Sequence, residues 1–90
     1  MIIGELIWDD ENVEHIARHN VTPKEVEEVC YSLHLNEKEG RQRYILSGQT
    51  ESGRYLNVVV EKISGGMFRP ITAFEMSESY KRKYRKMLGK

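Results

Sequence analysis

The fold is decided by residues 43–75, which read RYILSGQTESGRYLNVVVEKISGGMFRPITAFE. Three runs rich in β-branched and aromatic residues lie within this stretch: Arg43 to Gln49, Tyr55 to Ile63 and Met67 to Glu75. The connections, residues 50–53 and 64–66, have the length and the glycine and serine content of hairpin turns. The stretch therefore predicts three consecutive strands that pair antiparallel.

The middle run predicts a sheet with one covered face and one partly open face, because successive side chains of a strand point to opposite sides. One alternate set is apolar: Leu56, Val58 and Val60. The other set is mixed: Tyr55, Asn57, Val59 and Glu61. In the third run Pro70 has no N–H to donate, so this strand is expected to lie at an edge or to carry a bulge there.

Two helices are predicted before these strands. Asp9 or Asp10 can cap the first helix, which follows a strand-like run from Ile3 to Trp8 and is expected to end near Asn20. Its apolar positions recur at helical spacing: Val13, Ile16 and Ala17.

The second helix has a more specific start. Thr22 is placed as the N-cap, Pro23 as the first helical residue and Glu25 as the partner of Thr22 in a capping box. Val21 and Val26 are spaced as a hydrophobic staple. The predicted inward stripe is Val26, Val29, Cys30 and Leu33.

A third helix is predicted from Ser77, as its cap, to about Leu88. It carries five cations: Lys81, Arg82, Lys83, Arg85 and Lys86. A helix this basic on all sides is not expected to lie in the core.

The net charge of the chain is zero, but the charges are divided along its length. Three bases and ten acids lie at or before Gly40, a balance of −7, whereas eleven bases and four acids follow it, a balance of +7. Such asymmetry is typical of a surface for nucleic acid or for an acidic partner.

Length and composition exclude several classes of protein. Ninety residues favour one domain, residues 1–90, which is too small for a large cofactor enzyme. The single cysteine, Cys30, permits no intrachain disulfide, so a reducing, cytoplasmic location is expected. The apolar start contains Glu5 and is too short for a signal or membrane segment. No cofactor and no membrane partner are expected.

Two histidines, His15 and His19, have the i, i+4 spacing that lets both rings reach one metal ion. No third ligand is evident, and two surface histidines on one helix face are the commoner arrangement. We therefore predict no metal site.

Cations and aromatic rings are interleaved in the second half of the chain. Arg43, Arg54 and Arg69 on the strands accompany six rings: Tyr44, Tyr55, Phe68, Phe74, Tyr80 and Tyr84. Because cations neutralise phosphates and rings stack on unpaired bases, the pattern predicts single-stranded RNA binding. For each residue alone the alternative is a solvated face or a core ring. The RNA-binding candidates are Arg18, Arg43, Lys81, Arg82 and Arg85.

Metal-free RNA cleavage needs a base for the 2′-hydroxyl, an acid for the leaving oxygen and cations that stabilise the negative charge developing on the phosphorane. His19, beside Arg18, is the best acid–base candidate, because imidazole exchanges protons near neutral pH. Arg54 and Arg69 are the best charge stabilisers. The alternative for His19 is a hydrogen bond to a free carbonyl at the end of its helix.

Three segments give the chain a resemblance to the BrnT family of type II toxins, small RelE-like ribonucleases that are paired with an antitoxin. They are IWDDENVEHIARHNVTPKEVEEV (7–29), GQTESGRYLNVVVE (48–61) and RPITAFEMSESYKRKYRK (69–86). The matching features include Trp8-Asp9, Arg18-His19 and Gly53-Arg54. The closing strand and helix match through Arg69, Ile71, Thr72, Ala73, Met76 and Tyr84.

The resemblance implies an α+β fold with two N-terminal helices, an antiparallel β-meander of about four strands and a basic C-terminal helix. It implies a metal-independent ribonuclease that inhibits translation, with His19, Arg54, Arg69 and Tyr84 as catalytic candidates and an antitoxin as partner.

The chain departs from the family pattern at Phe74 and Tyr80, where an arginine and an acid are usual. The alternative is therefore a catalytically weakened homologue that binds its antitoxin or RNA.

Overall fold

The three strands predicted from residues 43–75 are present. A computed structural model describes residues 1–89 and contains β3 (Arg43–Gln49), β4 (Tyr55–Ser64) and β5 (Met67–Glu75). Both neighbouring pairs are antiparallel, and β4 extends one residue beyond the predicted end. The turn before β5 uses Gly65 at a φ of 53°, a left-handed conformation that glycine adopts without a steric penalty.

Two further strands complete a sheet with the order β1-β5-β4-β3-β2. Strand β2 (His34–Lys38) pairs antiparallel with β3, and β1 (Glu5–Leu6) pairs parallel with β5. The α+β class and the four-stranded antiparallel meander are thus confirmed, with a short parallel strand added at one edge. Strand β2 was not predicted individually, because its residues are mostly polar and exposed and lack an alternating apolar pattern.

Of the two alternatives predicted at Pro70, an edge strand or a bulge, the bulge is present, since β5 lies between β1 and β4. Val59 pairs with Thr72 while the next residue, Val60, pairs with Pro70, so Ile71 is the extra residue in β5. The carbonyl of Pro70 accepts a hydrogen bond of 3.0 Å from the Asn12 side chain. The irregular part of β5 is therefore held by the first helix.

That helix, α1 (Asp10–Ala17), begins at Asp9 as N-cap, with Asn12 as the reciprocal partner in a capping box. The predicted apolar stripe is wrong at two positions, because Val13 and Ala17 are exposed and only Ile16 is buried. Asn12, four positions before Ile16, lies on the inward face instead, because its amide bonds the carbonyls of Ile7 and Pro70.

The second helix, α2 (Pro23–Cys30), has the predicted Thr22 cap and capping box. Its staple residues, Val21 and Val26, are both buried. Leu33, predicted to lie inside, is 74% exposed, because the helix ends at Cys30 and the inward periodicity ends with it.

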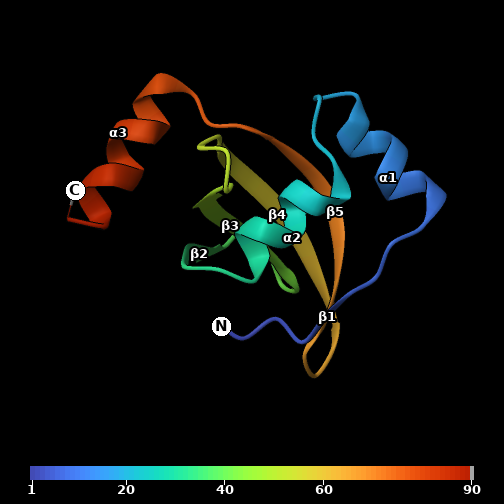
Figure 1. Cartoon of the computed structure of the whole chain (residues 1–90). Helices are drawn as coiled ribbons and strands as arrows, with labels where there is room; N and C mark the ends of the chain where they lie inside the picture. The colour runs from blue at the N-terminus through green and yellow to red at the C-terminus, as the bar shows by residue number, and fades with distance from the viewer. Residues whose placement is uncertain (90) are drawn as a thin grey trace.

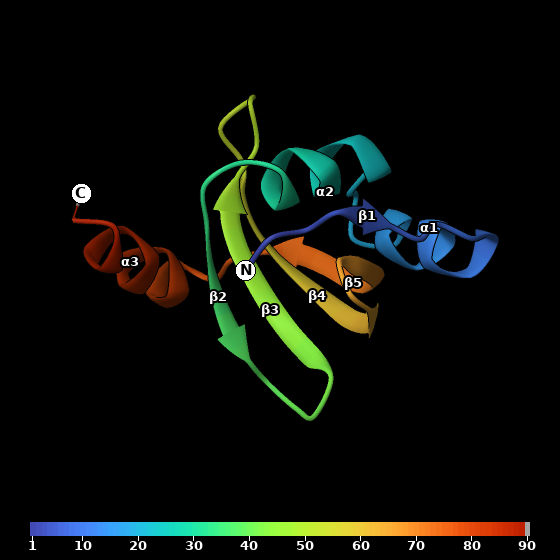
Figure 2. The same cartoon turned by 90° about the horizontal axis from the view of Figure 1, so that it is seen from below.

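Helices α1 and α2 lie together on one side of the sheet, whereas α3 (Glu78–Met87) lies apart from them, beyond β2 (Figures 1 and 2). Contacts of α2 with β3 and β4 and of α1 with β5 close the main core. Fully buried side chains there are Ile16, Val26, Val29, Leu46, Leu56, Val58 and Val60. No helix within residues 1–89 is both long and apolar enough to cross a membrane.

The opposite face of the sheet is less open than predicted. Of its β4 residues, Tyr55 and Glu61 are partly exposed, but Asn57 and Val59 are buried. Side chains at the paired positions Ser47 and Phe74 flank Asn57 on the same face. Packed side chains therefore bury much of this second face of the sheet.

The third helix has the predicted Ser77 cap, whose hydroxyl accepts from the backbone N–H of Tyr80. Its cations are mainly exposed, as predicted for a helix outside the core. Tyr84 alone among its residues is buried, at 3% exposure, and it anchors the helix to the sheet.

Candidate nucleic-acid interface

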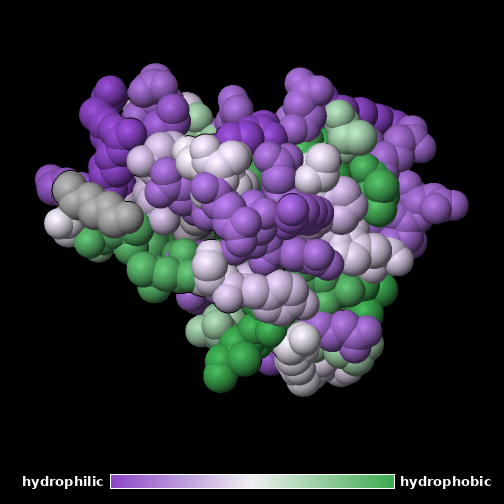
Figure 3. All heavy atoms as spheres, viewed as in Figure 1, coloured by the Kyte–Doolittle hydropathy of each residue, from purple (hydrophilic) through white to green (hydrophobic). Residues whose placement is uncertain are grey.

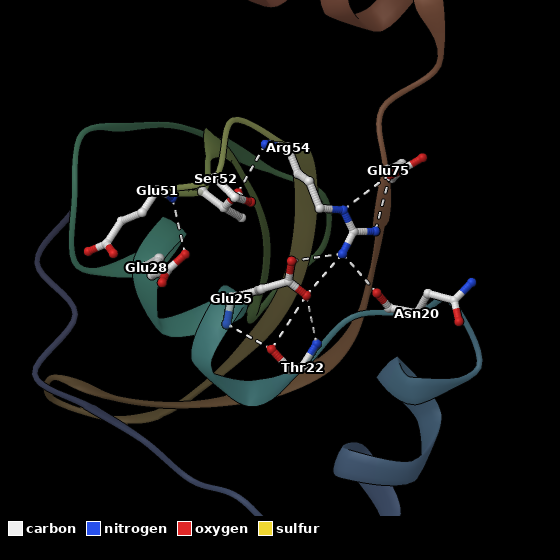
Figure 4. Close-up of polar contacts among 9 residues, drawn as sticks. Asn20, Thr22, Glu25, Glu28, Glu51, Ser52, Arg54 and Glu75 are labelled. Atoms are coloured by element: carbon white, nitrogen blue, oxygen red, sulfur yellow. Dashed lines mark hydrogen bonds and ion pairs between the residues drawn. The ribbon is translucent and has the colours of Figure 1, made fainter.

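Arg54 lies immediately before β4, in a cluster of hydrogen-bond acceptors (Figure 4). Its Nη1 donates to both oxygens of Glu25, at 2.9 and 2.8 Å, and to the Asn20 carbonyl at 2.8 Å. Its Nε donates to Glu75 at 3.2 Å. The hydrogen bonds to Glu25 raise the pKa of the guanidinium. Arg54 therefore joins α2, the loop before it and the end of β5.

Glu25 has two structural tasks in this cluster. It accepts from the Thr22 backbone N–H as part of the capping box, and it also binds Arg54. Burial alone raises the pKa of Glu25, but the hydrogen bonds from Arg54 and Thr22 outweigh this effect and lower the pKa overall. The folded state therefore favours the ionised carboxylate.

Arg69, near the start of β5, occupies a second acidic cluster. Its Nη2 lies 2.9 Å from Asp9 Oδ2 and 3.0 Å from Glu11 Oε1. The backbone N–H of Asn12 and the Arg69 guanidinium lower the pKa of Asp9. Arg69 precedes Glu75 by six positions on β5, about 20 Å at the rise of a strand, so the two arginine clusters are far apart.

Neither candidate charge stabiliser is available to a phosphate as the molecule stands. Each guanidinium is bound by two carboxylates, so each cluster has a surplus of negative charge. A phosphate would have to displace a carboxylate and would then face the remaining acid. This geometry favours a structural role for Arg54 and Arg69.

The free energy of unfolding is expected to fall as the pH drops below about 4, because the pKa values of Glu25 and Asp9 are lower in the folded state. A carboxylate of this kind adds stability above its unfolded pKa, and that stability is lost as the pH falls through the folded pKa. Urea unfolding between about pH 3 and pH 7 measures the effect. The Arg54→Ala variant should lose stability less steeply in acid, and an unchanged stability of the parent below pH 4 would contradict the assignment.

His19 lies in the turn after α1 and is exposed. Its ring centroid is 6.2 Å from that of Phe74 and 6.0 Å from that of His15. Its neighbour Arg18 forms an exposed ion pair with Glu14 at 3.2 Å. No group of three or more histidine, cysteine, aspartate or glutamate side chains within residues 1–89 is arranged to hold a metal ion.

Tyr55, the first residue of β4, directly follows Arg54 and is surrounded by residues of α3. Its ring meets Tyr84 edge-on, with centroids 5.9 Å apart. Lys81 Nζ lies 5.4 Å and Arg85 Cζ 5.0 Å from the Tyr55 centroid, and Arg85 also donates to the Tyr55 hydroxyl. Burial raises the pKa of Tyr84, so its phenol stays protonated. Cations and rings therefore alternate where α3 meets β4.

A cavity of about 280 Å³ lies between α3 and strands β2 and β3. Its lining residues are Leu35, Asn36, Glu37, Ile45, Ser47, Tyr80, Lys83, Tyr84 and Met87. Figure 3 shows hydrophilic residues along the upper edge of α3 and hydrophobic residues along its lower side. Leu35, Ile45, Tyr80, Tyr84 and Met87 make the lining of the cavity mainly apolar, and the basic helix α3 forms one of its sides.

Polar groups at this cavity form a short network. Ser47 Oγ donates to Asn57 Oδ1 at 2.6 Å and lies 3.2 Å from the Tyr80 hydroxyl. Lys83 Nζ lies 5.3 Å from the Tyr80 centroid and 3.9 Å from Glu37. Tyr80 therefore forms part of the wall of this cavity.

The structure brings only part of the predicted site together. Lys81, Arg82, Arg85 and Tyr84 share α3, whereas Arg43 lies on β3 with Glu61 at 3.9 Å. Arg18 and His19 follow α1, and Arg69 lies at the distant end of β5. Arg54, however, contacts the carbonyl of Asn20, which follows His19, and Tyr84 packs against Tyr55, which follows Arg54. Arg69 is therefore the catalytic candidate that lies apart from the other three.

Sequence reasoning missed Ser47, Asn57 and Glu37 as members of the site. The strand alternation placed Asn57 on the partly open face, and the pairing of β3 with β4 could have added its partner Ser47. Glu37 could not be placed, because β2 was not predicted as a strand.

The two oppositely charged halves of the chain do not form separate layers. Arg54, Arg69 and Lys83 from the basic half pair with Glu25, Asp9 and Glu37 from the acidic half. Part of the charge asymmetry is therefore neutralised by ion pairs between the two halves, and α3 carries a concentration of the remaining exposed cations.

Comparisons with protein-family models, with curated proteins and with solved structures gave no match.

Proposed function

We propose that this chain binds single-stranded RNA through α3 and the adjoining second face of the sheet. The observation that carries the proposal is the alternation of cations and rings there, with Lys81 and Arg85 on Tyr55 and Lys83 on Tyr80. Cations of this kind bind phosphates, and rings beside them stack on unpaired bases. Arg82 and Lys86, two positions before and after the buried Tyr84, add exposed cations on the outer side of the same helix.

We further propose that the protein acts in the cytoplasm as a BrnT-like member of a type II toxin–antitoxin pair. The resemblance through Trp8-Asp9, Arg18-His19 and Gly53-Arg54 supports this proposal. The partner would be a cognate antitoxin, and an acidic antitoxin segment would suit the cationic surface of α3.

Binding without efficient cleavage is favoured over a metal-independent ribonuclease. The reason is that Arg54 and Arg69 are each held by two carboxylates. The ribonuclease is the second candidate, because His19 is exposed and its neighbour Asn20 contacts Arg54, which leaves an acid–base group beside a cation.

The test is to incubate the purified chain with labelled single-stranded RNA in EDTA and to follow binding and RNA length together. We expect binding that weakens steeply with salt and RNA that stays intact. Binding that does not respond to salt would contradict the proposal. Cleavage that disappears in His19→Ala or Arg54→Ala, with the fold preserved, would establish the ribonuclease instead.

A further inference from the structure

The cavity beneath α3 has the size and walls of a pocket for one flat ring. Its volume of about 280 Å³ lies just below the range of roughly 300–1,000 Å³ for drug-sized ligands. Leu35 and Ile45 from the sheet face Tyr80 and Tyr84 from α3 across it. Apolar and aromatic walls of this kind hold unstacked bases in RNA-binding proteins.

The floor of the cavity carries hydrogen-bonding groups that are held in place. The Ser47 hydroxyl lies between Asn57 and Tyr80, at 2.6 and 3.2 Å. Asn57 is 4% exposed, so its amide is fixed by its surroundings.

At the rim, Glu37 and Lys83 form a loose pair. They are 3.9 Å apart, and both side chains are more than half exposed, so each can bind another group at little cost. A carboxylate only accepts hydrogen bonds, whereas an ammonium only donates them. Glu37 can therefore accept from an exocyclic amino group of a base, and Lys83 can bind the adjoining phosphate.

We propose that this cavity is a subsite for a single unstacked nucleobase and that it prefers adenine, cytosine or guanine to uracil. The first three carry exocyclic amino groups that can donate to Glu37, whereas uracil has no amino group and its single edge donor, N3–H, lies between two carbonyl oxygens that a carboxylate repels. The proposal rests on the proposed RNA binding and adds to it a position at which the base is read.

The test uses three labelled five-nucleotide RNAs that differ only at the centre, in a background of uridine: adenosine, uridine or an abasic residue. All three carry the same phosphates. Fluorescence anisotropy should show the adenosine oligonucleotide binding about tenfold more tightly than the abasic one, the factor expected for one stacked base, with the uridine oligonucleotide close to the abasic one.

Two matched tryptophan substitutions locate the subsite. Leu35→Trp should fill the cavity and lower the affinity for the adenosine oligonucleotide to the abasic level. Leu33→Trp, at a residue that is 74% exposed and outside the cavity lining, should leave it unchanged. Glu37→Gln should narrow the difference between adenosine and uridine, because a side-chain amide can also donate to uracil.

The outcomes separate the two proposals. Equal binding of the three oligonucleotides would overturn the base subsite and leave RNA binding intact, whereas binding of none would overturn both. Circular dichroism checks each variant for folding, and if Leu35→Trp does not fold, the three oligonucleotides on the unmodified chain still decide the question.

Discussion

Replacing Arg54 with alanine is expected to lower the free energy of unfolding by about 2–3 kcal/mol, the cost of removing one partner from a partly buried charged hydrogen-bond cluster. Arg54 is 25% and Glu25 19% exposed, so the lost bonds are only partly replaced by water. Glu25 would keep its capping role but lose its counter-ion. Urea unfolding at pH 7, followed by circular dichroism, measures the change.

The controls separate the shape of the guanidinium from its charge. Arg54→Lys should recover only part of the stability, because an ammonium cannot contact Glu25, Glu75 and the Asn20 carbonyl in the same planar arrangement. Glu75→Gln should cost less than about 1 kcal/mol, because Glu75 is 65% exposed. An Arg54→Ala variant as stable as the parent would remove the argument that Arg54 is structural and would return it to the candidate catalytic residues.

Reversing two charges on α3, with Arg82→Glu and Lys86→Glu together, is expected to weaken RNA binding at least about tenfold at 0.1 M salt. Each lost phosphate contact should also lower the slope of log affinity against log salt by about 0.7. Both side chains are exposed and neither forms an ion pair within residues 1–89, so the fold should be unaffected. Anisotropy titrations over a series of salt concentrations measure both quantities.

A matched pair on other surfaces provides the control. Lys24→Glu on α2 and Lys62→Glu on β4 make the same change of net charge away from α3. This double variant should bind RNA with nearly the affinity of the parent. Equal losses in the two double variants would mean that binding follows total charge and not the α3 surface.

Local physical chemistry was sufficient to predict most of the secondary structure. The Thr22 cap with Pro23 and Glu25 specified the start of α2, because all its partners lie within four residues. Pro70 predicted either an edge strand or a bulge, because its missing N–H disturbs any ladder in which it lies, and the bulge is present. The same local reasoning failed for Val13, because whether a helical face is inward depends on which strand it meets.

The candidate site could be predicted only in part. The cations and rings of α3 were predicted, because they are neighbours in one helix. The cavity was not predicted, because its walls come from β2, β3 and α3 and one of these strands has no local signature.

The sequence by itself determined the caps, the turns, three of the strands and a basic last helix, because each of these depends on residues that are close together in the sequence. The tertiary structure alone decided the partners of Arg54 and Arg69. Their acids lie 29 positions away at Glu25 and 60 positions away at Asp9. A guanidinium attracts a phosphate or a carboxylate alike, and only the folding of the chain decides which one lies within reach. For this reason Arg54 and Arg69, which were predicted to stabilise charge in RNA cleavage, form ion pairs within the fold instead. The exposed cationic surface remains on α3.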